Sequence, residues 1–155
     1  MRDMKTATTA KSTDTPRLDA QLCFALYSAG LAMNKVYRKH LKALDLTYPQ
    51  YLVMLVLWEK DGLSVSEIGA RLFLDSATLT PLLKRLDAAN LLVRSRSRDD
   101  EREVEVTLTP RGRQLQAKAS AVQHAIFCAT ACSANELKQL RDELRQLRGR
   151  LALAE

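Results

Sequence analysis

Residues 64–109 read SVSEIGARLFLDSATLTPLLKRLDAANLLVRSRSRDDEREVEVTLT, and this stretch decides the fold. Two short helical patterns are followed by two strand patterns with an arginine-rich tip between them. The second helical pattern places polar and basic side chains outward: Ser76, Thr78, Thr80, Lys84 and Arg85. The strands and tip add Arg94, Arg96, Arg98 and Arg102. A basic helix beside a basic hairpin is typical of a winged helix-turn-helix, so we expect a double-stranded DNA operator as partner.

Helix-start signals divide the rest of the sequence. Three residue pairs have the spacing of a capping box, namely Thr47 with Gln50, Ser64 with Glu67 and Ser133 with Glu136. Asp75 or Ser76 is expected to cap the second helix of the quoted stretch, and Thr109 followed by Pro110 opens the next helix. We predict helices over about 18–44, 47–60, 64–73, 76–89, 110–131 and 133–151, with strands over 91–97 and 103–109.

Two residues bear on the backbone of the quoted stretch. Pro81 lies inside a predicted helix and removes one hydrogen bond, so we expect a slight irregularity there and no break. Asn90 follows that helix at a position where a left-handed residue ends helices, and asparagine tolerates this conformation. Leu79, Leu82, Leu83 and Leu86 are the positions expected to face inward.

Composition limits the class of protein. The 155 residues are 46% hydrophobic and carry a formal net charge of +6, which fits one globular domain with a polyanionic partner. No apolar run of about 18 residues is present, so no membrane span is expected. The N-terminus lacks the apolar core of a signal peptide, and three cysteines are too few and odd for a secreted disulfide framework. We therefore expect a cytoplasmic protein.

The helical ends of the chain predict a subunit interface. Residues 1–17 are polar and aperiodic and read as a flexible tail, whereas 18–155 form a single domain. In that domain 18–46 and 110–155 are expected to be dimerisation helices, and 47–109 the DNA-binding lobe. The last helix carries a leucine seam with alternating steps of three and four: Leu137, Leu140, Leu144, Leu147 and Leu151. A monomer could bury this seam in its own core, but long helices at both ends favour a homodimer.

Cys23 has tyrosines nearby in the sequence. A lone helical cysteine is most simply a small buried hydrophobe. Tyr37 lies fourteen residues after Cys23, on the same helical face but about 21 Å further along the axis. Across an antiparallel two-fold contact, Tyr37 and Tyr48 of one subunit would reach Cys23 of the other. A phenol that donates to sulfur stabilises the thiolate, which is the form that attacks a peroxide.

His124, Cys128 and Cys132 recur every four residues on one predicted helix. All three are metal-ligand types, but His124 and Cys132 are about 12 Å apart along a helix axis, so one ion cannot bind all three. A two-ligand site completed by another chain stays open, as does a spare buried thiol at Cys132. We expect no metal and no cofactor, and we expect His40 at the surface or the interface.

The run DSATLTPLLKRLDAANLLVRSRSRDDEREVEVTLTPRG, residues 75–112, resembles the winged-helix core of the MarR family of bacterial transcription regulators. The resemblance implies that Asp100 and Arg102 form the Asp-x-Arg of the wing. It also implies that Arg94 is the partner of Asp100 and that Arg102 enters the minor groove. Asn90 departs from the family pattern, which usually has glycine there.

Cys23, Tyr27, Tyr37 and Tyr48 together resemble the OhrR branch of this family, the organic hydroperoxide sensors. The similarity covers about 22–151. It implies that Cys23 is the peroxide-sensing thiol and that Tyr37 and Tyr48 of the partner subunit hydrogen-bond to it. It further implies that Cys128 is a resolving thiol, as in the two-cysteine sensors of xanthomonads.

The resemblance predicts a repressor that an organic hydroperoxide releases from DNA. The oxidant would convert Cys23 to sulfenic acid, and Cys128 of the partner subunit would then form an intersubunit disulfide with it. A disulfide needs Cα atoms within about 7 Å, so a distant resolving thiol would require helix movement. Phe24 and Leu26 would favour apolar peroxides. The alternative is a repressor relieved by a non-covalent phenolic ligand, and the winged helix argues against a thiol peroxidase enzyme.

Overall fold

The computed structural model describes residues 15–155, so the predicted tail over 1–17 lies mostly outside the described residues. Within 15–155, no helix has the length and apolar character needed to cross a membrane. The chain forms two compact units, the first ending at Met33 and the second spanning Asn34–Glu155. Each unit is therefore described by itself.

The first unit consists of the 3₁₀ turn η1 (Leu18–Ala20) and the first part of α1 (Leu22–Leu41). None of its described residues is buried. Large apolar side chains are therefore open to solvent: Leu18, Leu22, Phe24, Leu26, Tyr27, Leu31 and Met33. The helix predicted over 18–44 is divided, because a 3₁₀ turn flanks α1 at each end.

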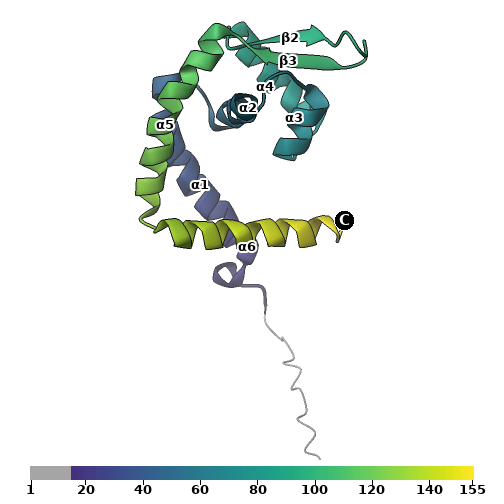
Figure 1. Ribbon diagram of the computed structural model, residues 1–155. Helices are drawn as coiled ribbons and strands as arrows, with labels where there is room; N and C mark the ends of the chain where they lie inside the picture. The colour runs from purple at the N-terminus through teal and green to yellow at the C-terminus, as the bar shows by residue number, and fades with distance from the viewer. Residues whose placement is uncertain (1–14) are drawn as a thin grey trace, which may run out of the picture. The chain divides into compact units, whose positions relative to one another are not determined.

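The second unit contains the end of α1 and the remaining elements, which Figure 1 shows in chain order. They are η2 (Lys42–Leu44), α2 (Tyr48–Glu59), β1 (Leu63–Ser64), α3 (Val65–Leu72), α4 (Ser76–Ala88), β2 (Leu92–Arg96), β3 (Val104–Leu108), α5 (Pro110–Thr130) and α6 (Ala134–Ala152). The helical fold with a small hairpin confirms the predicted winged helix-turn-helix. The sequence did not predict β1, because a strand of two residues is too short to leave a pattern.

Side-chain caps start the helices as the sequence indicates. Thr47 accepts a hydrogen bond from the backbone of Gln50, and the Gln50 side chain accepts one in return from Thr47. The other two predicted capping boxes are also present. Asp75, and not Ser76, caps α4 by accepting from the backbone N–H of Thr78 at 2.7 Å. Each cap satisfies backbone donors that have no partner inside the helix.

The sheet has three antiparallel strands in the order β1-β3-β2. Leu92 pairs with Leu108 at the open end of the hairpin, and Arg96 pairs with Val104 next to the turn at its tip. β1 adds Leu63 opposite Val106 on the other edge of β3. Since Leu92, Val106 and Leu63 are almost fully buried, one face of the hairpin closes the core while its tip extends into solvent.

Helices α2, α3 and α4 supply most of the core. The largest fully buried side chains come from these helices, α1, β2 and β3: Leu41, Met54, Leu57, Ile68, Leu79, Leu83, Leu86, Leu92, Val53 and Val106. The run YLVMLVLW, residues 51–58, is apolar nearly all round and so predicts a buried helix, which the burial of α2 confirms. Leu79, Leu83 and Leu86 face inward as predicted, whereas Leu82 is only half-buried.

Backbone details at the end of α4 also match the sequence. Pro81 lies inside α4 without ending the helix. Asn90 adopts the left-handed conformation with φ of 59°, which confirms the prediction that asparagine can stand in this position. The carbonyl of Asn90 accepts from the Thr109 hydroxyl at 2.7 Å, so the turn before β2 is tied to the start of α5.

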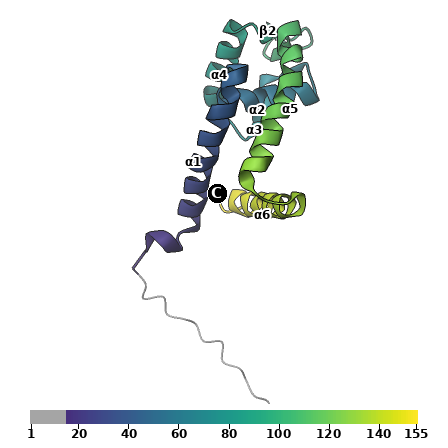
Figure 2. The same cartoon turned by 90° about the vertical axis from the view of Figure 1, so that its left-hand side faces the viewer.

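Two polar contacts hold the hairpin and α5 against α2. The indole N–H of Trp58 donates to the Gly112 carbonyl at 2.9 Å. Asp61 accepts from the backbone N–H of Leu108 at 2.9 Å. Gly112 lies so close to the Leu91 carbonyl oxygen that a methyl group there would overlap it. From this junction α5 leads away from the lobe and turns into α6 (Figure 2).

We expect Gly112→Ala to destabilise the fold by about 3 kcal/mol, because the added methyl group displaces backbone that has no room to move. Gly149→Ala is the matched control, since nothing lies within 4 Å of a methyl group there, and alanine should stabilise α6 by about 1 kcal/mol. Urea unfolding at one fixed protein concentration measures both. Equal stability of Gly112→Ala and the wild type would contradict this packing.

Candidate functional site

Helix α4 presents the polar face expected of a DNA-reading helix. Ser76, Thr78, Lys84 and Arg85 are exposed, whereas Thr80 is half-buried and offers less of its hydroxyl. Ala77 and Pro81 are also exposed on α4. The sequence interpretation missed these two because neither carries a polar group. Their small apolar surfaces suit close approach to thymine methyl groups in a major groove.

The hairpin corrects one expected contact. Asp100 was expected to pair with Arg94, but the Arg94 guanidinium pairs with Asp87 of α4, with Nε and Oδ2 3.1 Å apart. Asp100 instead accepts from the backbone N–H of Arg102 at 3.0 Å and so holds the turn at the tip. The reason is register, because Arg94 pairs with Val106 in the middle of the strands, whereas Asp100 lies at the tip.

Asp87 pairs with Arg94, so the cations left to bind phosphate are the other basic side chains of α4 and the hairpin. Five of them form no ion pair with any residue in the described range 15–155, and these are Lys84, Arg85, Arg96, Arg98 and Arg102. Their charges remain available for phosphate groups. The Arg94–Asp87 ion pair joins the middle of β2 to α4, so the hairpin and this helix are connected directly.

The tyrosines of the second unit form a cluster. The rings of Tyr37 and Tyr48 have centroids 4.5 Å apart, and Tyr51 lies 6.0 Å from Tyr37. Burial, with the neighbouring phenols Tyr48 and Tyr51, raises the pKa of Tyr37 to about 12. Burial also raises the pKa of Tyr48. Both phenols therefore stay protonated at neutral pH and can donate hydrogen bonds.

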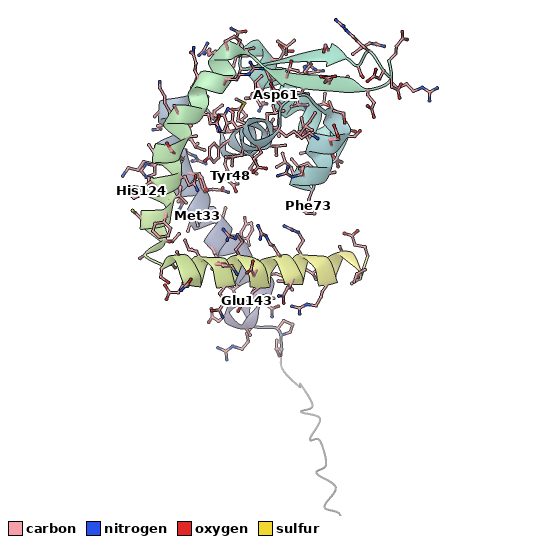
Figure 3. All side chains as sticks on the ribbon, viewed as in Figure 1. Met33, Tyr48, Asp61, Phe73, His124 and Glu143 are labelled. Atoms are coloured by element: carbon pink, nitrogen blue, oxygen red, sulfur yellow. The ribbon has the colours of Figure 1, made fainter. Side chains whose placement is uncertain are left out.

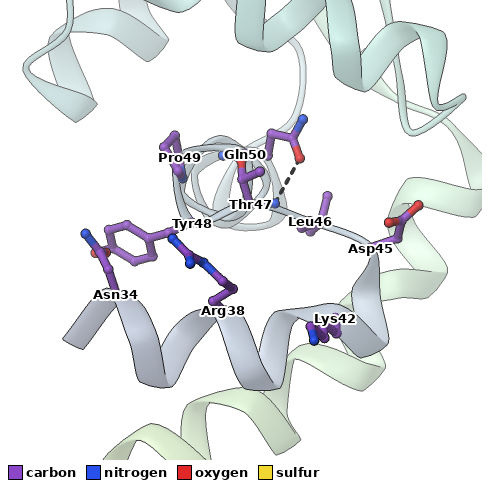
Figure 4. Close-up of a pocket in the computed structure, with 9 residues that line it drawn as sticks. All are labelled: Asn34, Arg38, Lys42, Asp45, Leu46, Thr47, Tyr48, Pro49 and Gln50. Carbon is purple, nitrogen blue, oxygen red and sulfur yellow. Dashed lines mark hydrogen bonds between the residues drawn. The ribbon is translucent and has the colours of Figure 1, made fainter. Parts of the chain in front are cut away.

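An open pocket of about 570 Å³ borders this cluster at Tyr48. Figure 4 shows Asn34 and Arg38 of α1 beside the Tyr48 ring, with Lys42 further along the chain at the start of η2. The pocket also includes the α2 start and the turn before it: Asp45, Leu46, Thr47, Pro49 and Gln50. Arg38 forms no ion pair within the described residues. The pocket thus offers a cation next to a phenol.

The three thiols differ in their surroundings. Cys23 is exposed on α1, so the single chain does not bury it as a small hydrophobe. Cys128 is exposed on α5, and its sulfur lies 3.6 Å from Nε2 of His124. Cys132 is half-buried, and its thiol donates to the Thr130 carbonyl at 3.3 Å. Figure 3 shows His124 projecting outward from α5.

The expected redox residues fall into the two units. Cys23 and Tyr27 belong to the first unit, and Tyr37, Tyr48 and Cys128 belong to the second. The structure therefore brings Tyr37 and Tyr48 together and leaves the pairing of Cys23 as a prediction. Tyr51, which is 4% exposed, is the member of the cluster that the sequence interpretation missed. In the sequence, the one indication that Tyr51 packs inside the fold was its position in the apolar run of α2.

Comparisons with known proteins agree with this fold. Residues 35–119 match the family described as "Transcriptional regulator SarA/Rot". The chain is 51% identical over 138 residues to "HTH-type transcriptional regulator TtmR" of Methylorubrum extorquens (strain PA1), covering 89% of this chain and 71% of that protein.

A second relative and a solved structure are also similar over most of the chain. The "Organic hydroperoxide resistance transcriptional regulator" of Bacillus subtilis (strain 168) is 44% identical over 131 residues, covering 84% of this chain and 89% of that protein. The "Structure of reduced AbfR bound to DNA" has a TM-score of 0.73 at 40% identity, covering 88% of this chain and 95% of that chain.

We expect Lys84→Ala and Arg102→Ala each to weaken DNA binding at every sequence and to lower the slope of log affinity against log salt by about 1. Lys138→Ala is the control, because that lysine is exposed on α6 and already pairs with Asp142. Fluorescence anisotropy over a salt series measures the slope. An unchanged slope in both lobe variants would show that these cations do not touch phosphate.

Tyr37 should make stability fall at high pH. The unfolded chain ionises this phenol near pH 10.0, while the folded chain holds it protonated to about pH 12. Its contribution is therefore complete below pH 10 and is lost between these two values. We expect the free energy of unfolding, measured in urea, to fall less between pH 10 and pH 12 for Tyr37→Phe than for the wild type. Tyr27→Phe, at an exposed position, should decline like the wild type, and an identical decline in all three proteins would refute this contribution.

Proposed function

Because the chain belongs to the MarR-type transcriptional regulators, of the SarA/Rot kind, we propose that it is a homodimeric repressor which organic hydroperoxides release from its operator. The observation that carries this proposal is the Tyr37–Tyr48 pair, two adjacent phenols that stay protonated at neutral pH. Such phenols stabilise a thiolate by donating hydrogen bonds to it. In a dimer, Cys23 of the partner subunit is the thiol they would serve.

Two relatives support redox control of DNA binding. The Bacillus subtilis relative is named for organic hydroperoxide resistance, and the AbfR structure is described as reduced and bound to DNA. Both are regulators similar to this chain over more than four fifths of its length. We therefore assign the reduced protein to the DNA-bound state and the disulfide-bonded protein to the released state.

The proposed chemistry has two steps. The Cys23 thiolate attacks the distal oxygen of the hydroperoxide, the O–O bond breaks, and the oxidant leaves as an alcohol after taking one proton. Cys23 is then a sulfenic acid. In the second step the Cys128 thiol of the partner subunit attacks the Cys23 sulfur. A disulfide forms, and the sulfenic oxygen leaves as water.

The surroundings of the thiols favour Cys128 over Cys132 as the resolving group. Cys128 is exposed and has an imidazole within hydrogen-bond reach. Cys132 is half-buried, and its proton is engaged by the Thr130 carbonyl. Since the thiolate is the nucleophile in disulfide formation, a thiol that is accessible and beside a proton acceptor resolves faster.

A second copy of the chain would cover apolar surface that a single chain leaves open. The described first unit buries none of its side chains, and in the α6 seam Leu140, Leu144 and Leu151 are exposed. This exposure is an argument against the alternative in which a monomer buries the seam in its own core. Apolar stripes of this kind on long helices are covered by helix–helix packing between subunits.

The alternative function, relief by a non-covalent phenolic ligand, is favoured by one observation. The pocket beside Tyr48 is open and contains Arg38, which has no ion-pair partner within residues 15–155 and suits a phenolic ligand that carries a carboxylate. This alternative and oxidation differ in one measurable respect, because ligand relief proceeds under fully reducing conditions and does not need Cys23.

We expect Cys23→Ser to bind operator like the wild type and to remain bound when cumene hydroperoxide is added. Cys128→Ser should be released poorly and form no covalent dimer on non-reducing gels, whereas the matched control Cys132→Ser should form that dimer normally. Electrophoretic mobility shifts and gels on the same samples give both results. Release of Cys23→Ser by the hydroperoxide would overturn the proposal, and a covalent dimer in Cys128→Ser would move the resolving role to Cys132.

A further inference from the structure

Cys128 and His124 form a side-chain pair on α5. The Cys128 sulfur and Nε2 of His124 are 3.6 Å apart, and the two residues lie one helical turn from each other on the same face. Both side chains are exposed. Within 15–155, His124 is the side chain hydrogen-bonded to this thiol and has no carboxylate partner of its own.

We propose that His124 carries the proton in the resolving step. It accepts the thiol proton of Cys128 as the sulfur attacks the partner's Cys23 sulfenic acid, and it returns that proton to the departing oxygen. This inference rests on the proposed function, because the sulfenic acid is the product of the organic hydroperoxide. His124 takes a direct part in the reaction, because its imidazole lies within hydrogen-bond distance of the attacking sulfur.

The step balances with no further reactant. The bond between the two sulfurs forms as the S–O bond of the sulfenic acid breaks, and the departing hydroxide keeps that electron pair. The hydroxide takes the proton from His124 and leaves as water. His124 ends in its starting state, so one imidazole serves repeated cycles once a cellular thiol has reduced the disulfide.

The geometry suits this role for two reasons. The residues share one rigid helix, so the imidazole stays within reach of the sulfur whatever path brings Cys23 to Cys128. An imidazole ring carries both an acceptor nitrogen and a donor N–H, so the same side chain can take up the thiol proton and pass it on. Cys132 has no such group, because its hydrogen-bond partner is the Thr130 carbonyl, which cannot take up a proton.

The test separates the two chemical steps in the full-length protein. A Cys132→Ser background removes the competing thiol. Stoichiometric cumene hydroperoxide is added at pH 7, dimedone trapping with mass spectrometry follows sulfenic acid at Cys23, and quenched non-reducing gels follow the disulfide. We expect His124→Ala and His124→Gln to form sulfenic acid at the wild-type rate and disulfide about 100-fold more slowly. His40→Ala, which changes the other histidine, should match the background in both steps.

Free imidazole provides the decisive readout, because it replaces a missing proton carrier but not a missing structural contact. Added imidazole should restore much of the disulfide rate in His124→Ala and leave the background rate unchanged. Disulfide formation in His124→Ala at the background rate would overturn the inference, as would a slow rate that imidazole does not restore. A background protein that makes no Cys23–Cys128 disulfide at all would instead overturn the proposed function, and the inference with it.

Discussion

A row of four aromatic rings connects the Tyr37–Tyr48 pair of the second unit to the start of α5. Tyr37 packs on Tyr48 and Tyr51, and Tyr51 meets the edge of Trp58 with ring centroids 6.3 Å apart. Trp58 in turn donates to the Gly112 carbonyl at the start of α5, where the backbone abuts the base of the hairpin. Packed rings have few alternative arrangements. The phenols and the start of α5 are therefore joined by a continuous series of ring contacts and one hydrogen bond.

An ion pair determines how α4 and the hairpin are held together. The Arg94–Asp87 ion pair fixes the hairpin to α4, and within residues 15–155 the arginines nearer the tip form no ion pair. The placement of α4 relative to the hairpin is therefore held by a direct contact within the second unit.

Local rules explain what the sequence could predict. Three capping boxes, the left-handed Asn90 and the burial of α2 depend on neighbours within a few residues, and all were predictable. The contacts that the sequence did not predict depend on how separate elements pack in the folded chain. Arg94 pairs with Asp87 because strand pairing places it away from the tip. Tyr51 packs against Tyr37 because α2 packs on α1. The role of Cys23 rests on resemblance, since its expected partners belong to another subunit.

We propose above all that oxidation of one thiol per subunit releases DNA. The most direct test adds hydroperoxide stepwise to the operator-bound reduced protein, up to and beyond one equivalent per subunit, and reads intact mass and DNA occupancy from the same samples. We expect occupancy to fall in proportion to the covalent dimer and to reach its minimum at about one oxidant per subunit. Full conversion to the disulfide with occupancy unchanged, or release before any change in mass, would contradict it.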